Sequence, residues 1–171
     1  MEIITEAGKK ELDVIQDAVK NHLNDLATLN SKIKKTLEPF SDNKNLKGDE
    51  VIGWLGEIYG KALLLGKLVD DQHDIEANGK RISVKARKGN NKGWQISGII
   101  YRNKEKEPPT DLMFIHFNDD YTIDRIWLYD WNDMINEKRL KAKKVGDDER
   151  GFIFKVRNIK DRENVIYSKP I

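Results

Sequence analysis

Apolar residues in the first part of the chain recur at the spacing of one helical face. Two series fall seven residues apart: Leu12, Val19, Leu26 and Ile33 in the first, and Ile15, His22 and Leu29 in the d-like register of the same seam. No proline interrupts the pattern before Pro39, and such a repeat predicts one long amphipathic helix. We expect residues 1–40 to form an N-terminal helical arm. It packs along the rest of the chain, against a second helix of the chain, or in a coiled-coil dimer.

A second helical pattern extends from Val51 to Leu65. Asp49 is a suitable N-cap and Gly66 a suitable C-terminal stop. Within this stretch Glu57 stands among three glycines, at positions 53, 56 and 60. Each glycine costs about 1 kcal/mol in a helix interior, so the three suggest that another backbone passes close by. Close packing of the helix on a sheet, with Glu57 merely exposed, would also explain them.

Apolar and polar residues alternate on both sides of Asn78-Gly79, which predicts a β-hairpin. Asn-Gly supplies the two positive-φ residues that a type I′ turn requires. The expected cross-strand pairs are Ala77 with Lys80, Glu76 with Arg81, Ile75 with Ile82, and Asp74 with Ser83. Side chains alternate between the faces of a sheet, so one face of the hairpin is apolar and turns toward a core. The other face is polar and holds Asp74, Glu76, Arg81, Ser83 and Lys85.

Three further segments have the composition of strands. They span residues 111–117, 123–128 and 152–156, and Asn118 to Asp120 form a turn between the first two. A chain of 171 residues has room for one domain with a sizeable core. We therefore predict an α/β fold in which helices flank a mixed central sheet of four or five strands, with the core domain over residues 48–171.

The composition narrows the chemistry that the chain can perform. It has no cysteine and three histidines, which excludes thiolate zinc sites and argues against a histidine-rich metal site. Any metal is expected to have oxygen ligands. No apolar run reaches the ~18 residues of a membrane span, and the N-terminus lacks the basic and apolar regions of a signal peptide. We expect a cytoplasmic protein with no membrane partner.

The polar face of the hairpin places carboxylates beside an ammonium group, within cross-strand reach. Such a group can hold a divalent metal ion and activate a water molecule next to a phosphate. A charged and solvated outer face would have the same sequence pattern.

The order of these elements resembles the PD-(D/E)XK nuclease superfamily, the fold of many restriction endonucleases. The resemblance covers roughly residues 50–130: a helix with Glu57, a strand with Asp74, and a strand that ends in Ile82-Ser83-Val84-Lys85. It implies a restriction-endonuclease-like fold. It also implies that Asp74 binds Mg²⁺, that Lys85 orients and activates the attacking water, and that Glu57 completes the site.

Ser83 stands where the superfamily motif has an acid. Some restriction enzymes of the superfamily look similar, with Ser-x-Lys at this place and the carboxylate supplied from elsewhere. Glu76 is the nearest candidate, on the same face and one cross-strand pair away. The implied catalytic residues are Asp74, Lys85, Glu57 and Ser83, and the implied metal ligands are Asp74, Glu57 and Glu76.

The net charge of the chain is only +2, so attraction to nucleic acid must come from local clusters. One cluster follows Lys85 directly in a loop with glycines. The residues expected to contact DNA there are Arg87, Lys88, Asn90, Asn91, Lys92 and Trp94. A second cluster, residues 138–144, is interpreted as the solvated surface of a helix or loop. Phosphate contacts position a duplex without specifying its sequence.

These features predict a Mg²⁺-dependent DNA endonuclease of the type II restriction kind, in which Mn²⁺ can substitute. Cutting both strands of a palindrome requires two sites, so a homodimer is expected. Two alternatives remain open. One is a catalytically impaired nucleic-acid-binding module of the same fold, and the other is a repair or structure-specific nuclease that acts on branched or damaged DNA.

Overall fold

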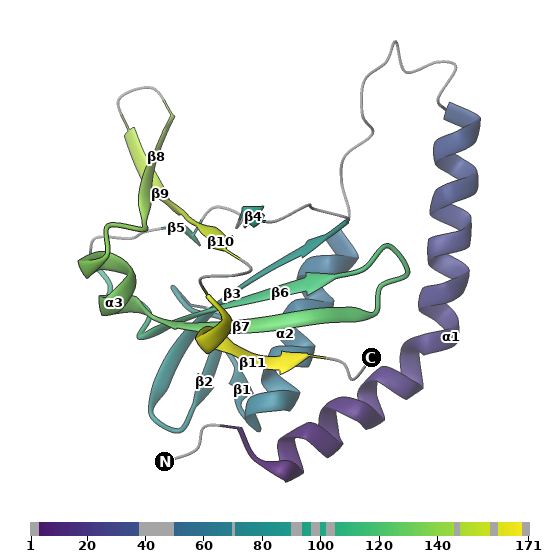
Figure 1. Cartoon of the computed structure of the whole chain (residues 1–171), viewed down its shortest axis with the longest axis horizontal. Helices are drawn as coiled ribbons and strands as arrows, with labels where there is room; N and C mark the ends of the chain where they lie inside the picture. The colour runs from purple at the N-terminus through teal and green to yellow at the C-terminus, as the bar shows by residue number, and fades with distance from the viewer. Residues whose placement is uncertain are drawn as a thin grey trace.

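A computed structural model describes residues 4–37, 50–69, 71–89, 94–96, 100–101, 105–145, 148–157 and 161–168 of the chain. Three α-helices and one 3₁₀ turn lie in these ranges: α1 (Glu6–Leu37), α2 (Glu50–Leu64), α3 (Trp131–Asn136) and η2 (Arg162–Asn164). Figure 1 shows a central sheet with α2 behind it and α1 along one side. Residues 38–49, where the expected arm ends and the expected core domain begins, lie outside the described ranges.

The central sheet has six strands in the order β1-β2-β3-β6-β7-β11. These are β1 (Lys67–Leu68), β2 (Ile75–Ala77), β3 (Lys80–Lys88), β6 (Asp111–Phe117), β7 (Ile123–Asp130) and β11 (Val165–Ser168). Strands β3 and β6 are parallel and all other neighbours are antiparallel, so the sheet is mixed. The predicted α/β fold with a mixed sheet is confirmed at this level. The predicted four or five strands are too few, because short strands β1 and β11 extend both edges.

Two small sheets account for the other strands. Strand β4 (Trp94–Ile96) pairs with β10 (Lys155–Arg157), and β5 (Ile100–Tyr101) pairs with β9 (Asp148–Ile153), which also pairs with β8 (Lys141–Val145). The prediction of a single strand over 152–156 is therefore wrong, because the chain leaves one sheet at Phe154 and enters the other. The predicted helix or loop surface over 138–144 is also wrong from Lys141 on, where the chain forms β8.

Each face of the central sheet covers its own hydrophobic core. On one face α2 and α1 pack over a cluster that includes Leu12, Tyr59, Leu63, Val84 and Met113. On the other face the cluster lies between the sheet, α3 and β10, and includes Phe114, Trp127, Tyr129, Trp131 and Phe154. Residues of β3 alternate between the two faces, which fixes where the polar side chains of this strand can point.

Helix α1 packs along the core in this structure. Leu12 is fully buried and α1 contacts α2. Near the other end of α1, Asn30 donates a hydrogen bond of 2.7 Å to the hydroxyl oxygen of Tyr121 in the β6–β7 turn. Leu29, which the heptad pattern places on the apolar seam, is exposed instead.

The predicted hairpin is confirmed in turn and in register. Asn78 and Gly79 have φ angles of 50° and 75°, as a type I′ turn requires. Strands β2 and β3 pair Ile75 with Ile82, Glu76 with Arg81, and Ala77 with Lys80. The apolar face of the hairpin packs into the core below α2, since Ile75, Ile82 and Val84 are all buried there.

The glycines of α2 provide a matched test of how closely the helix approaches the sheet. A Cβ atom at Gly56 would lie 2.7 Å from Cβ of Ala86, whereas one at Gly53 would have no atom within 4 Å. The expectation of a close neighbour is thus confirmed at Gly56 and wrong at Gly53. We predict that Gly56→Ala lowers the free energy of unfolding by about 1–3 kcal/mol through overpacking. Gly53→Ala should raise it by about 0.5–1 kcal/mol through helix propensity.

Urea denaturation of the two variants measures both effects against wild type. Because the same substitution is made twice on one helix, equal changes in stability would contradict this description of the α2–β3 contact.

Candidate active site

The two strands of the hairpin separate at Asp74. Its backbone N–H still donates to the carbonyl of Ile82 at 2.9 Å, but the β2–β3 pairing ends at Ile75 and Ile82. Beyond this point β3 continues to pair with β6 on its other side. The edge of β3 that faces β2 therefore carries unpaired backbone groups from Val84 onward unless a side chain reaches them.

The carboxylate of Asp74 reaches this edge. Its Oδ2 accepts a hydrogen bond of 2.6 Å from the backbone N–H of Val84 and a longer one of 3.4 Å from the hydroxyl of Ser83. Among the described residues its Oδ1 accepts no hydrogen bond. Asp74 is therefore fixed by the backbone of β3 and still has one oxygen with which it can bind a ligand.

Ser83 has the role of a hydrogen-bond donor in this arrangement. Its side chain is buried and its hydroxyl points to Asp74. It alternates with Val84 along β3, so it lies on the face opposite α2, beside Leu112 of β6. A hydroxyl cannot supply the charge of a carboxylate, but it can orient the Asp74 carboxylate.

Glu57 approaches the same place from α2. Burial of its side chain raises its pKa above the usual range of a glutamate, the nearby Asp74 carboxylate raises it further, and the Lys85 ammonium lowers it. These influences require that Glu57, Asp74 and Lys85 lie close enough to interact electrostatically. The structure thus brings together three of the residues that the sequence singles out, one from α2, one from the start of the hairpin and one from β3.

Lys85 completes this group from β3. Its side chain is half-buried, and its ammonium forms no hydrogen bond or ion pair with any residue that the structure describes. Its backbone lies beside Phe114 in the parallel pairing of β3 with β6. A lysine held on a buried strand, with its donors available, is suited to bind a phosphate oxygen or a water molecule.

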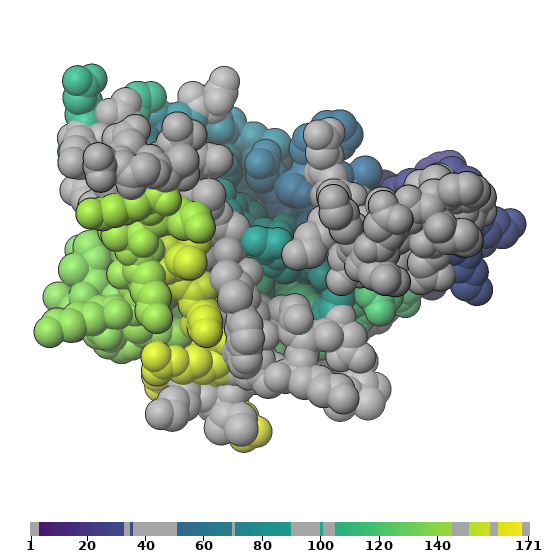
Figure 2. All heavy atoms as spheres, turned by 90° about the horizontal axis from the view of Figure 1, so that it is seen from above, coloured from purple at the N-terminus to yellow at the C-terminus, as the bar shows by residue number. Residues whose placement is uncertain are grey.

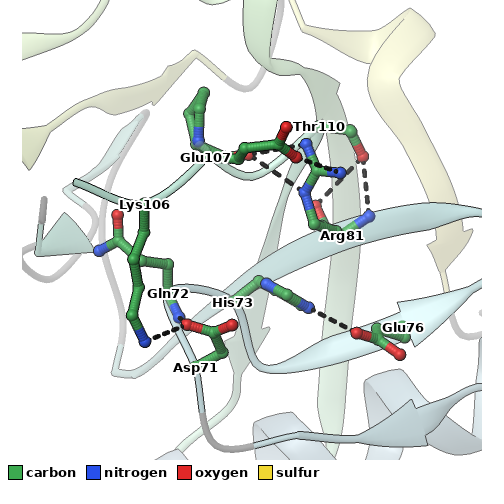
Figure 3. A network of polar contacts seen from close by, with 9 residues as sticks. Asp71, Gln72, His73, Glu76, Arg81, Lys106, Glu107 and Thr110 are labelled. Carbon is green, nitrogen blue, oxygen red and sulfur yellow. Dashed lines mark hydrogen bonds and ion pairs between the residues drawn. The ribbon is translucent and has the colours of Figure 1, made fainter. Parts of the chain in front are cut away.

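Glu76, which the sequence predicts as a metal ligand, has a side-chain partner outside this group. It lies in β2 beyond the bend at Asp74, and its carboxylate forms an ion pair with Nε2 of His73 at 3.2 Å. Figure 3 shows the His73 ring directed at Glu76. Because this contact already engages its carboxylate, Glu76 is less available to a metal ion than Glu57.

A network of exposed ion pairs joins the hairpin to the segment before β6 (Figure 3). Arg81 contacts the carboxylate of Glu107 at 3.0 Å and the carbonyl oxygen of Pro108. Lys106 contacts Asp71 at 2.5 Å. Arg81 therefore has its binding partners within its own chain. The polar face of the hairpin thus contributes residues both to this network and to the site around Asp74.

Some of the predicted DNA-contacting residues lie outside the described ranges. Arg87 is exposed near the end of β3. Lys88 is half-buried, and its ammonium lies 4.1 Å from the centroid of the Tyr121 ring, with which it forms a cation–π contact. Asn90, Asn91 and Lys92 lie outside the described residues, as does the side chain of Trp94 in β4.

His116 is a buried residue that the sequence reasoning missed. Its Nε2 lies 2.6 Å from the carbonyl oxygen of Gly89 and its Nδ1 lies 2.9 Å from the carboxylate of Asp124. It therefore fixes the chain where β3 ends. No local pattern indicates this, because Gly89 and Asp124 become its neighbours only through the pairing of β3, β6 and β7.

The carboxylates of Asp74 and Glu57 form a donor set that suits Mg²⁺. In the described part of the chain no cluster of three or more acidic or histidine side chains has the geometry of a metal site. Mg²⁺ commonly uses only one or two carboxylates and completes its shell with water and substrate phosphate oxygens. A cation between Asp74 and Glu57 would also relieve the repulsion that raises the Glu57 pKa.

Neither a scan against models of known protein families nor a search of curated proteins finds a match to this chain. Within the described ranges, no helix has both the length and the apolar character needed to cross a lipid bilayer.

The raised pKa of Glu57 has a consequence for stability. The folded protein binds the Glu57 proton more tightly than the unfolded chain does, so ionisation of Glu57 opposes folding as pH rises through its folded pKa. We predict that Glu57→Gln stabilises the metal-free protein at neutral pH. The gain should vanish below about pH 4, where the glutamate is protonated in both states. Thermal unfolding in chelator at both pH values tests this, and an equal gain at both would exclude charge as its cause.

Proposed function

We propose that this protein is a Mg²⁺-dependent DNA endonuclease that hydrolyses phosphodiester bonds. The proposal rests on the electrostatic interaction of Glu57 with Asp74 and Lys85, next to the point where the pairing of β2 and β3 ends. These residues and their order along the chain resemble the PD-(D/E)XK arrangement. The mixed sheet with α2 packed on one face supports the same proposal at the level of fold.

Each side chain has a defined role in the proposed reaction. Asp74 and Glu57 would hold Mg²⁺, which supplies Lewis-acid polarisation of the phosphate and a bound water of lowered pKa. Ser83 and the Val84 N–H keep the Asp74 carboxylate in place. Lys85 orients the attacking water and stabilises the negative charge that develops on the phosphate oxygens. The water oxygen forms a bond to phosphorus as the phosphorus–oxygen bond to the leaving sugar oxygen breaks. The water loses one proton to solvent and the sugar oxygen takes one from solvent, which gives a phosphate end and a hydroxyl end.

A type II restriction enzyme is the specific kind of endonuclease that we propose. It would act as a homodimer on duplex DNA, because two identical sites related by a twofold axis match a palindrome. The absence of a motif acid at Ser83 favours one second candidate, a module of the same fold that binds nucleic acid and no longer cleaves it.

Cleavage assays separate these two functions. We expect the purified protein to cleave members of a panel of duplex, branched and methylated DNA substrates in Mg²⁺ or Mn²⁺, and to be inactive in chelator. Glu57→Ala should lower the cleavage rate severely, since Glu57 interacts with Asp74 and Lys85. Glu76→Ala is the matched control and should be nearly silent, because Glu76 pairs with His73.

Tight DNA binding without cleavage of any substrate would identify the binding module instead. Neither binding nor cleavage would contradict both candidates. A severe effect of Glu76→Ala together with a silent Glu57→Ala would retain the nuclease but assign the second carboxylate to Glu76.

A further inference from the structure

Strands β8 and β10 each present two exposed cations at alternate positions. Side-chain burial alternates along residues 154–157: Phe154 and Val156 are buried, whereas Lys155 and Arg157 are exposed. In β8 all of the described side chains are exposed, and Lys141 and Lys143 pair with Ile153 and Gly151 of β9. Alternate residues of one strand share a face, so Lys141 and Lys143 lie on one side of β8, and Lys155 and Arg157 lie on the exposed side of β10. We call the set Lys141, Lys143, Lys155 and Arg157 the ribbon stripe.

Aromatic contacts fix which face points outward. Phe152 alternates with the stripe residues and packs edge-on against Trp131 at 5.8 Å between ring centroids. Phe154 packs in the same way against Tyr129 at 5.4 Å and against Phe114 at 6.1 Å. The aromatic face is thus held against the core of the protein, so the stripe faces away from it.

The stripe is a local concentration of positive charge. The whole chain carries a net charge of only +2, yet residues 141–145 and 151–157 contain no acid. Lys141, Lys143 and Arg157 form no ion pair with any residue in the described ranges. Asp148 and Glu149 lie at the other end of β9, paired with Val145 and Lys144. Exposed cations without an ion-pair partner among the described residues are typical of a surface that binds an anionic polymer.

A buried ion pair holds this surface rigidly on the central sheet. Arg139 contacts the Asp161 carboxylate at 2.6 Å and also donates to the carbonyl oxygen of Lys155 at 3.0 Å. The same carboxylate accepts from the backbone N–H of Arg157 at 2.7 Å. The backbone at both cations of β10 is therefore fixed before any partner binds, which lowers the entropy cost of binding.

We propose that the ribbon stripe binds the phosphate backbone of the duplex DNA that the protein cleaves. This inference rests on the proposed nuclease function and assigns to it a binding surface apart from the loop after β3. In Figure 1 the β8–β9 hairpin rises from one end of the molecule, above α3. Figure 2 shows β8 to β10, in lime and yellow, on the same face of the molecule as part of β3, in teal. A duplex positioned by phosphate contacts at the stripe can thus extend toward the strand that carries Lys85.

The salt dependence of DNA binding tests the stripe directly. Each protein cation that contacts a phosphate adds about −0.9 to the slope of log K against log salt concentration. The variant Lys141→Gln, Lys143→Gln, Lys155→Gln, Arg157→Gln should therefore have a slope that is smaller by about 3 to 4, and an affinity at least about tenfold lower at moderate salt. Binding is measured in chelator with a short synthetic duplex, so that cleavage does not interfere.

A matched control removes four exposed lysines from α1 and β1: Lys10→Gln, Lys20→Gln, Lys35→Gln and Lys67→Gln. It changes the net charge by the same amount and should leave the slope almost unchanged. Thermal unfolding of both variants must match wild type, which their exposure leads us to expect.

The possible results separate a failure of the proposed stripe–DNA contact from a failure of the proposed nuclease function. A wild-type slope in the stripe variant, with DNA cleavage retained, would overturn the stripe and leave the nuclease proposal standing. An equal reduction in the control variant would also overturn it, since only the net charge would then matter. Absence of duplex binding by the wild-type protein, even if it bound anionic vesicles, would overturn the stripe and the nuclease proposal together.

Discussion

Lys85→Ala is expected to lower the rate of DNA cleavage by about 10²–10³-fold at saturating Mg²⁺, the usual effect of removing one group that stabilises transition-state charge. The free energy of unfolding should change little, because the ammonium of Lys85 has no hydrogen-bond or ion-pair partner among the described residues. Asp74→Asn should have an effect at least as large on cleavage, since it removes a charged metal ligand but keeps an acceptor for the Val84 N–H.

The control for Lys85→Ala is Lys67→Ala, which removes an exposed lysine from β1 at the far edge of the hairpin. It should retain wild-type cleavage. Single-turnover rates on one substrate, with circular dichroism to check the fold, compare the two variants. Wild-type activity in Lys85→Ala would show that the motif has been assigned to the wrong lysine.

Asp161→Asn is expected to lower the free energy of unfolding by about 3–5 kcal/mol, the range found when one partner of a buried ion pair is removed. The side chains of Arg139 and Asp161 are only 8% and 4% exposed. Without the carboxylate, the Arg139 guanidinium stays buried with its charge uncompensated. Tyr129 also loses a charged acceptor for its hydroxyl, whose pKa is raised by burial and by Asp161.

Urea denaturation measures this loss, with Glu107→Gln as the control. Glu107 also pairs with an arginine, but its side chain is 79% exposed, and exposed ion pairs contribute at most about 1 kcal/mol. A loss of less than about 1 kcal/mol in Asp161→Asn would mean that the pair is solvated in solution and does not hold β10 in place.

The elements with strong local signals were predictable from the sequence. The Asn78-Gly79 turn requires positive φ at two successive residues, which few dipeptides supply, and this alone fixes the register of β2 and β3. Helix α2 was likewise predictable from its apolar spacing. Its end differs in one detail, because Leu65, with φ of 49°, takes the left-handed position expected of Gly66. Gly66 is needed instead for its close approach to β2.

Elements that depend on distant partners were not predictable. Strand β1 has two residues, too few for an alternating pattern to identify it. The run 152–156 is continuously extended in its sequence pattern, yet Phe154 separates β9 from β10 because the two pair with different strands. The sequence predicts that the cations near Lys141 are exposed to solvent. It does not predict that they lie near Lys155 and Arg157, because that arrangement depends on strand pairing.

The candidate site shows the same division. The hairpin register placed Asp74 opposite Ser83, and the Ser83 hydroxyl does donate to the Asp74 carboxylate. Glu76 was expected to join them by strict alternation, and its carboxylate contacts His73, a partner that the alternation of the strand does not indicate. The position of Glu57 depends on how α2 packs on β3. The glycines of α2 suggest that the helix lies close to a neighbour, but the sequence pattern does not give the direction in which Glu57 points.

The position of a bound Mn²⁺ ion, located by anomalous scattering in crystals of the protein, tests the proposed metal centre most directly. We predict one peak in contact with Oδ1 of Asp74 and the carboxylate of Glu57, at metal–oxygen distances of about 2.1 Å, with Lys85 facing the open side of the ion. A Mn²⁺ ion bound by Glu76 away from Lys85, or no peak at Asp74 at a saturating Mn²⁺ concentration, would contradict the assignment of this site.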